Sequence, residues 1–124
     1  MKNECVFSIP QLVVSIFKGP FRTRKRAVKF LFQRLTRGWD DSASWNVAQN
    51  TAAYMLPRLR VFRKKTNGTP FDLTLEEWHA IIDEIIWYLE GFDDSLPTDF
   101  SPETMERHEK ASQLFGKYFG HLWW

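Results

Sequence analysis

The stretch that decides the fold is SWNVAQNTAAYMLPRLRVFRKK, at residues 44–65. Apolar side chains recur in it at alternating spacings of three and four, which is typical of one face of an α-helix. They are Trp45, Ala48, Ala52, Met55, Leu59 and Phe62. A weaker stripe consists of Val47, Thr51, Tyr54, Arg58 and Val61. Two semi-apolar faces indicate a central helix over Ser44–Lys65, and Pro57 predicts a kink in it because proline removes a backbone donor.

The segment before this helix predicts two more helices. Spacings of i, i+3, i+4 and i+7 predict a helix over Arg22–Arg37 that ends at Gly38. The apolar face that we expect it to bury is Val28, Leu31, Phe32 and Leu35. Ile9-Pro10 opens a shorter segment that Gly19-Pro20 closes. We expect a helix there, although its β-branched residues leave a short strand as the alternative.

The segment after the central helix also predicts two helices. The run Thr74-Leu75-Glu76-Glu77 matches a capping box and starts a helix that ends at Glu90. Its apolar face is Trp78, Ile81, Ile82, Ile85, Ile86 and Leu89. An acidic loop follows, and Ser101-Pro102 starts the last helix as N-cap and first helical residue. We expect the terminal Trp123-Trp124 to dock on the chain's own core or on a neighbouring subunit.

Together these segments predict an all-α fold: one compact domain of four to five helices over residues 1–124. Its parts are an apolar N-terminal segment at 1–21, a helical core at 22–91, and an acidic loop with a C-terminal helix at 92–124. With 124 residues, of which 44% are hydrophobic, the chain is long enough for one packed core and short for two.

Charge is distributed unevenly along the chain. Residues 1–70 contain 14 Lys/Arg and 3 acidic residues, a net +11, whereas residues 71–124 contain 3 Lys/Arg and 12 acidic residues, a net −9. The two halves could attract each other, within one chain or between chains. Alternatively, the basic half could meet an anionic partner such as phosphate, nucleic acid or lipid headgroups.

Several classes of protein are disfavoured by the composition. The single cysteine, Cys5, excludes an intrachain disulfide, and with no signal-peptide pattern it favours a cytoplasmic protein. No apolar run is long enough to span a membrane. His79, His108 and His121 are isolated, so we expect no metal and a surface or capping role. No nucleophile or phosphate-loop motif is present, so we expect neither enzymatic activity nor a cofactor.

One stretch has the composition of a nucleotide-binding site. Guanidinium groups bind phosphate oxygens, aromatic rings stack on bases, and a carboxylate accepts the N–H groups of guanine. Between residues 34 and 65 the residues of these types are Arg37, Trp39, Asp40, Asp41, Trp45, Tyr54 and Arg58. We expect Arg58 to be buried beside Pro57 and to pair with either a ligand phosphate or a protein carboxylate, for which Asp40 and Asp41 are the nearest candidates in sequence. The simpler interpretation is a capped helix with Trp45 in the core and ordinary surface arginines.

Three motifs resemble a group of small bacteriophage proteins. They are Arg37-Gly38-Trp39-Asp40-Asp41-Ser42 with Trp45, Leu56-Pro57-Arg58-Leu59-Arg60 with Phe62, and Leu73-Thr74 with Glu76-Glu77-Trp78 and Asp83-Glu84. The motifs cover residues 34–90, and the group is similar to the phage anti-CBASS sponge proteins. The resemblance implies a non-catalytic helical oligomer that sequesters a cyclic dinucleotide, such as 3'3'-cGAMP, in the host cytoplasm. It adds Trp78 to the candidate ligand-binding residues.

We therefore expect a homo-oligomer, a dimer or tetramer, with a cyclic dinucleotide as ligand and no membrane partner. Three other functions remain open. The helix Arg22–Arg37 could bind nucleic acid. The acidic half could recognise and inhibit a host protein. The segment Val6–Phe17 with its basic neighbours could bind a membrane surface.

Overall fold

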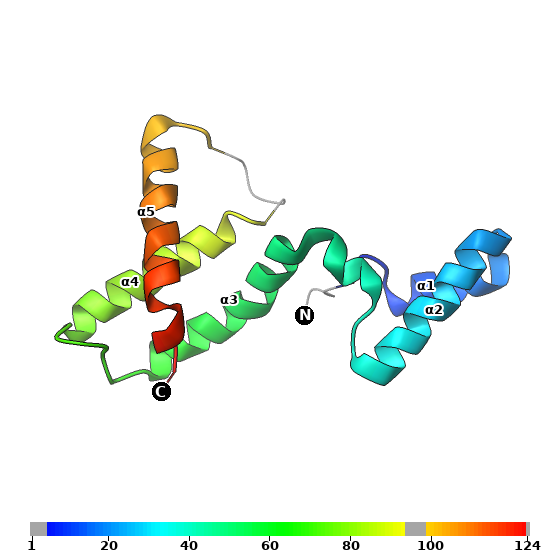
Figure 1. Ribbon diagram of the computed structural model, residues 1–124, viewed down its shortest axis with the longest axis horizontal. Helices are drawn as coiled ribbons and strands as arrows, with labels where there is room; N and C mark the ends of the chain where they lie inside the picture. Colours follow the sequence, from blue (N-terminus) through cyan, green and yellow to red (C-terminus); the bar gives the residue numbers. More distant parts are fainter. Residues whose placement is uncertain (1–4, 94–98, 124) are drawn as a thin grey trace. The chain divides into compact units, whose positions relative to one another are not determined.

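The computed structural model describes residues 5–93 and 99–123, and all regular structure in these ranges is helical (Figure 1). The α-helices are α1 (Ile9–Lys18), α2 (Phe21–Arg37), α3 (Val47–Lys65), α4 (Leu75–Glu90) and α5 (Pro102–Tyr118). Two short 3₁₀ helices are η1 (Asp41–Asn46) and η2 (Phe119–His121). The predicted all-α class is confirmed, and α1 forms as a helix rather than a strand.

The chain divides into two compact units, an N-terminal unit (Met1–Asn50) and a C-terminal unit (Thr51–Trp124). The boundary lies inside α3, one turn after that helix begins. Each unit is described by itself below. The single domain over 1–124, with its core at 22–91, stays a prediction. Most of the acidic loop expected between the last two helices, including residues 94–98, lies outside the described residues.

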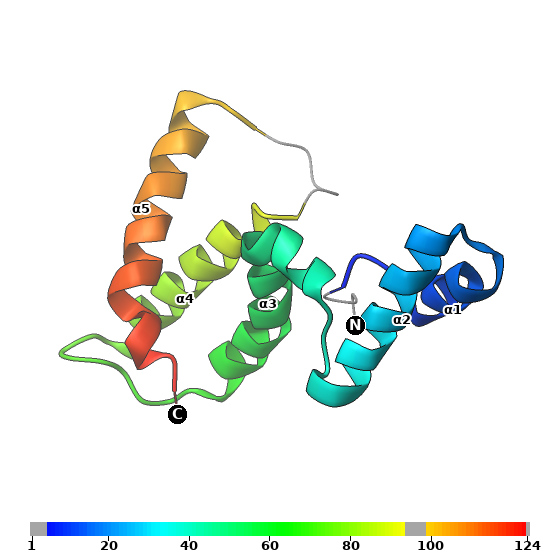
Figure 2. The same ribbon diagram turned by 45° about the vertical axis from the view of Figure 1, so that its right-hand side comes forward.

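The N-terminal unit is built on an antiparallel hairpin of α1 and α2, which lie side by side in both views (Figures 1 and 2). The Ser8 side chain accepts a hydrogen bond from the Gln11 backbone and so starts α1, with Pro10 in its first turn. The small core between the helices contains Leu12, Ala27 and Phe30, with Phe7, Ile16 and Leu31 packed against it. Gly38 ends α2 in the left-handed conformation, with φ of 84°.

The face that α2 buries is not the predicted one. Ala27 and Phe30 are buried and Leu31 is half-buried, whereas Val28, Phe32 and Leu35 are 53%, 65% and 86% exposed. The prediction for these three residues was wrong because α2 has apolar side chains around most of its circumference. Periodicity alone does not say which of these apolar side chains α1 covers. Helix α1 packs against the face that contains Ala27, because the small alanine side chain allows the two helix backbones to come close.

The C-terminal unit packs α3, α4 and α5 around one core. The buried side chains are Ala52, Leu59 and Phe62 from α3, Trp78, Ile82, Ile85 and Leu89 from α4, and Tyr118 from α5. The predicted face of α4 is confirmed, with Ile81 and Ile86 at its half-buried edges. The predicted caps are also confirmed. Thr74 and Glu77 form a capping box, and Ser101 caps α5.

Helix α3 begins at Val47 rather than Ser44, because Asp41–Asn46 form η1. It continues as one helix through Pro57, and the expected kink stays a prediction. The second stripe lies on the solvent side, with Val47, Tyr54 and Val61 between 48% and 61% exposed. The exposure of the second stripe therefore does not support the prediction of a central helix, which rested on two semi-apolar faces.

Candidate functional site

The segment from Arg37 to Ser42 connects α2 to η1 in the N-terminal unit, and its first aspartate is completely buried. Asp40 Oδ2 accepts a hydrogen bond from Arg34 Nε at 2.6 Å. Asp40 Oδ1 accepts one from the Ser42 backbone N–H at 2.9 Å and one from the Ser42 hydroxyl at 2.5 Å. Burial raises the pKa of Asp40, but the hydrogen bonds from Ser42 and Arg34 outweigh it and hold this pKa below its ordinary value. Asp40 is thus an ionised N-cap of η1.

The same network holds the chain ahead of α1. Arg34 Nη2 donates to the Phe7 carbonyl, and the Ser42 hydroxyl oxygen accepts from the Val6 N–H at 3.0 Å. The Asp40 N–H faces the Cys5 sulfur at 3.5 Å. All acceptor positions of Asp40 that face the protein are therefore used internally, which gives this candidate residue a structural role.

The exposed part of the segment is a cluster of four side chains, the Lys29–Arg37–Trp39–Asp41 cluster. The Arg37 guanidinium lies over the Trp39 ring, 3.8 Å from its centroid, and its Nε donates to the Trp39 carbonyl at 3.0 Å. Asp41 pairs with Arg37 at 2.5 Å and with Lys29 at 2.7 Å. Hydrogen bonds from Gln33, Lys29 and Arg37 lower the pKa of Asp41, so this carboxylate stays ionised.

This cluster can bind an anion attached to a ring. Two cations share one carboxylate, which leaves a net positive charge next to an indole that is 42% exposed. A phosphate oxygen could replace Asp41 as the acceptor for Arg37 and Lys29, because both side chains reach solvent. The free face of the indole could stack on a base.

Trp45 belongs to an aromatic cluster in the same unit. Its ring lies 6.1 Å from that of Phe7 and 6.3 Å from that of Phe30, both in edge-on orientations. Arg26 lies over the Phe7 ring at 5.2 Å. Trp45 is nevertheless 57% exposed, so it packs at the edge of the small core between α1 and α2, and its expected place inside the core was wrong.

Tyr54 and Arg58 form a second stacked pair, on α3 in the C-terminal unit. The Arg58 guanidinium lies 3.5 Å from the centroid of the Tyr54 ring, and its Nη1 donates to the Tyr54 carbonyl at 2.7 Å. Arg58 is exposed, so its expected burial was wrong, whereas its expected pairing with Asp40 or Asp41 would join the two units and stays a prediction. Both aspartates bond to cations of the N-terminal unit.

Trp78, the last candidate, is a core residue of the C-terminal unit. It is 1% exposed, and its ring lies 5.5 Å from that of Tyr118 and 6.3 Å from that of Phe62. An indole packed on these two rings is not free to stack on a base. The eight candidates therefore divide into five in the N-terminal unit and three in the C-terminal unit. Of the five, the structure brings Arg37, Trp39 and Asp41 together on the surface.

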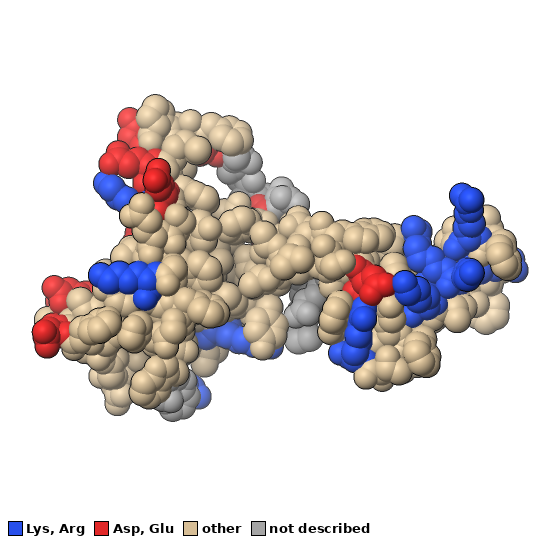
Figure 3. All heavy atoms as spheres, in the orientation of Figure 1, with Lys and Arg blue, Asp and Glu red and all other residues tan. Residues whose placement is uncertain are grey.

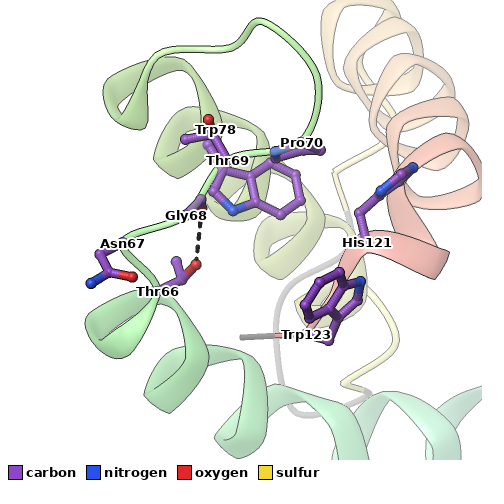
Figure 4. Close-up of a pocket in the computed structure, with 8 residues that line it drawn as sticks. All are labelled: Thr66, Asn67, Gly68, Thr69, Pro70, Trp78, His121 and Trp123. Atoms are coloured by element: carbon purple, nitrogen blue, oxygen red, sulfur yellow. Dashed lines mark hydrogen bonds between the residues drawn. The ribbon is translucent and has the colours of Figure 1, made fainter.

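A cavity of about 260 Å³ lies in the C-terminal unit, where the loop after α3 meets η2 (Figure 4). It is lined by Thr66, Asn67, Gly68, Thr69, Pro70, Trp78, His121 and Trp123. Thr66 shapes one wall through a hydrogen bond from its hydroxyl to the Gly68 carbonyl. Sequence reasoning treated this loop only as a helix breaker. The lining holds no lysine or arginine, so the cavity suits an uncharged group better than a phosphate.

Two of the three histidines, His108 and His121, lie among aromatic rings. The His108 ring is 4.8 Å from that of Tyr88, and the His121 ring is 5.0 Å from that of Phe71. His79 is half-buried, and its Nε2 has no hydrogen-bond partner. Within residues 5–93 and 99–123, no three His, Cys, Asp or Glu side chains come close enough together to hold a metal ion.

Comparison with known proteins adds no relative. No protein-family model, curated protein or solved structure matches this chain. Among the described helices, none combines the length and the apolar character that crossing a membrane requires.

Proposed function

We propose that this protein is a non-catalytic binding protein that sequesters a cyclic dinucleotide, such as 3'3'-cGAMP, in the manner of the phage anti-CBASS sponges, and so blocks host defence signalling in the infected cytoplasm. The observation that carries the proposal is the Lys29–Arg37–Trp39–Asp41 cluster. It presents two cations and an indole on one surface, and three of its four residues, Arg37, Trp39 and Asp41, lie in the first of the three motifs on which the resemblance rests.

The chemistry of a cyclic dinucleotide matches this cluster in two respects. Its phosphates are acceptors for the forked donors of Arg37 and for the ammonium of Lys29. Its bases have π faces that stack on an indole. Without ligand, Asp41 holds the two cations in place. When the ligand binds, Asp41 competes with the phosphate for these cations. This competition sets the affinity, and no covalent bond is broken.

Calorimetric titration of the full chain with a panel of cyclic dinucleotides tests the proposal. Arg37→Ala should weaken binding by about 10- to 100-fold, because a hydrogen bond to a charged group contributes about 1.5–3 kcal/mol. The matched control is Arg60→Ala, an exposed arginine of α3 that pairs with Glu90 at 2.8 Å and should leave affinity unchanged. Equal effects of the two substitutions, or no binding of any panel member, would contradict the proposal.

A sequestering protein returns its ligand unchanged. After incubation with the protein and heat denaturation, chromatography should recover the intact cyclic dinucleotide in full. Steady accumulation of a linear product would show hydrolysis and would replace this proposal with an enzymatic one.

We further propose that the protein acts as a homo-oligomer, a dimer or tetramer. Trp123 supports this proposal, because its side chain is 76% exposed in a single copy, and a large exposed indole is typical of an interface.

A further inference from the structure

The tip of the α1–α2 hairpin exposes two phenylalanines between cations. Phe17 and Phe21 lie on either side of the turn and are 75% and 81% exposed. Their chain neighbours Lys18 and Arg22 are also exposed, and neither makes an ion pair with any described residue. Figure 3 shows how lysines and arginines gather over this hairpin. Between residues 5 and 39 the sequence contains no acidic residue at all.

Further apolar side chains are exposed along both helices. On α1 they are Val13 and Val14, at 40% and 55% exposure, because α1 contributes only Leu12 and Ile16 to the hairpin core. On α2 Phe32 is 65% exposed, and Lys25 on the same helix is also exposed. Several large apolar side chains exposed on one small hairpin point to an interaction site.

Hydrogen bonds satisfy several backbone groups of the turn, whereas the first N–H groups of α2 have no side-chain cap. Arg24 Nε donates to the Gly19 carbonyl at 2.6 Å, and its Nη2 donates to the Phe17 carbonyl at 3.3 Å. The Gly19 N–H donates to the Ser15 carbonyl at 3.0 Å. A Cβ at position 19 would lie 2.5 Å from that same oxygen, so glycine is required for the close turn. Satisfaction of the Phe17 and Gly19 carbonyl groups lowers the cost of moving this part of the turn into an environment poor in water.

We propose that the hairpin tip docks on an anionic membrane surface. Phe17 and Phe21 enter the boundary between headgroups and acyl chains, while Lys18, Arg22 and Lys25 bind lipid phosphates. A membrane accounts for both features of the tip. Duplex nucleic acid would neutralise the cations but leave the phenylalanines in water, because its bases are already stacked on one another, and the same face of a second copy would bring cations against cations.

Vesicle flotation with the full chain tests this inference. The protein should float with phosphatidylcholine vesicles that contain phosphatidylglycerol and not with phosphatidylcholine alone, and salt should weaken the binding. The double substitution Phe17→Ser with Phe21→Ser should lower the partition coefficient by more than about tenfold. The matched control is Phe71→Ser with Phe100→Ser, two phenylalanines of the C-terminal unit that are 73% and 77% exposed and should not matter.

Three outcomes would overturn the inference. The first is absence of binding to anionic vesicles, and the second is an equal loss in the control. The third is a dimer that sedimentation equilibrium detects without lipid and that the Phe17/Phe21 variant dissociates, since a second copy would then occupy the surface. Circular dichroism should show unchanged helicity, because both side chains are exposed. The Phe17/Phe21 variant should keep its affinity for a cyclic dinucleotide, so that failure here and failure of the proposed function are distinguishable.

Discussion

Arg34 Nε donates to Asp40 Oδ2 over 2.6 Å, and the carboxylate that accepts this bond has no solvent exposure. The next residue, Asp41, faces outward and pairs with Lys29 and Arg37. Two adjacent aspartates thus have different tasks. Asp40 joins α2 to η1 and holds the segment around Phe7, whereas Asp41 belongs to the exposed cluster proposed to bind the ligand.

Replacing Asp40 by asparagine should destabilise the N-terminal unit by about 3–5 kcal/mol, because removal of one partner leaves a nearly buried guanidinium without its counter-ion. Arg34 is 10% exposed, so water compensates little. Chemical denaturation, monitored by hydrogen exchange of the α2 amides, measures the loss of unfolding free energy. Asp41→Asn is the control, and its loss should be clearly smaller because both of its partners reach solvent. Similar losses in the two variants would show that Asp40 is not a structural anchor.

Stability should fall in acid in a way that depends on Asp40. Its pKa is lower in the folded chain than the ordinary value of about 3.9 in the unfolded chain. The ionised carboxylate therefore stabilises the fold fully above pH of about 4, and this contribution is lost as pH falls through the folded pKa. Denaturation curves between neutral and acidic pH should show a steeper decline for the natural chain than for Asp40→Asn. Parallel curves would contradict the assignment.

The two faces of α2 should respond differently to truncation. Phe30→Ala should cost about 3–5 kcal/mol of unfolding free energy, because Phe30 is 3% exposed and packs in the hairpin core. Leu35→Ala should stay within about 0.5 kcal/mol of the natural chain, because Leu35 is 86% exposed. Thermal and chemical denaturation of both variants measure these changes in unfolding free energy and so show which face of α2 is buried. A larger loss for Leu35 than for Phe30 would restore the face that periodicity predicted.

Trp123→Ala should weaken the proposed homo-oligomer without unfolding the monomer. Sedimentation equilibrium should report a dissociation constant at least about tenfold higher, as is typical of a tryptophan at an interface hot spot. Phe119→Ala is the control, because Phe119 is 58% exposed on the same stretch of chain. A natural chain that stays monomeric at high micromolar concentration would reject the oligomer itself.

The sequence by itself determined the helices and most of their ends. The caps at Thr74, Ser101 and Gly38 are local chemistry, since each satisfies backbone groups within a few residues of itself. The apolar face of α4 could also be predicted from the sequence, because Glu76, Glu77, Asp83 and Glu84 occupy much of the rest of the helix surface. The division of the chain into basic and acidic parts also follows from residue order alone.

Only the tertiary structure decided which surfaces remained open. Helix α2 has apolar residues on two faces, and contact with α1 determined that Phe30 is covered while Phe32 is not. The roles of Asp40 and Asp41 were likewise hidden in the sequence. Two adjacent carboxylates are chemically alike, and only the position of Arg34 on the inner side of α2 gives one of them a buried partner. Arg58 shows a related limit, because within its own unit it bonds to the Tyr54 carbonyl and lies over the Tyr54 ring, which the sequence alone did not indicate. Helical periodicity is set by the backbone, whereas burial and charge pairing depend on which segments meet in space.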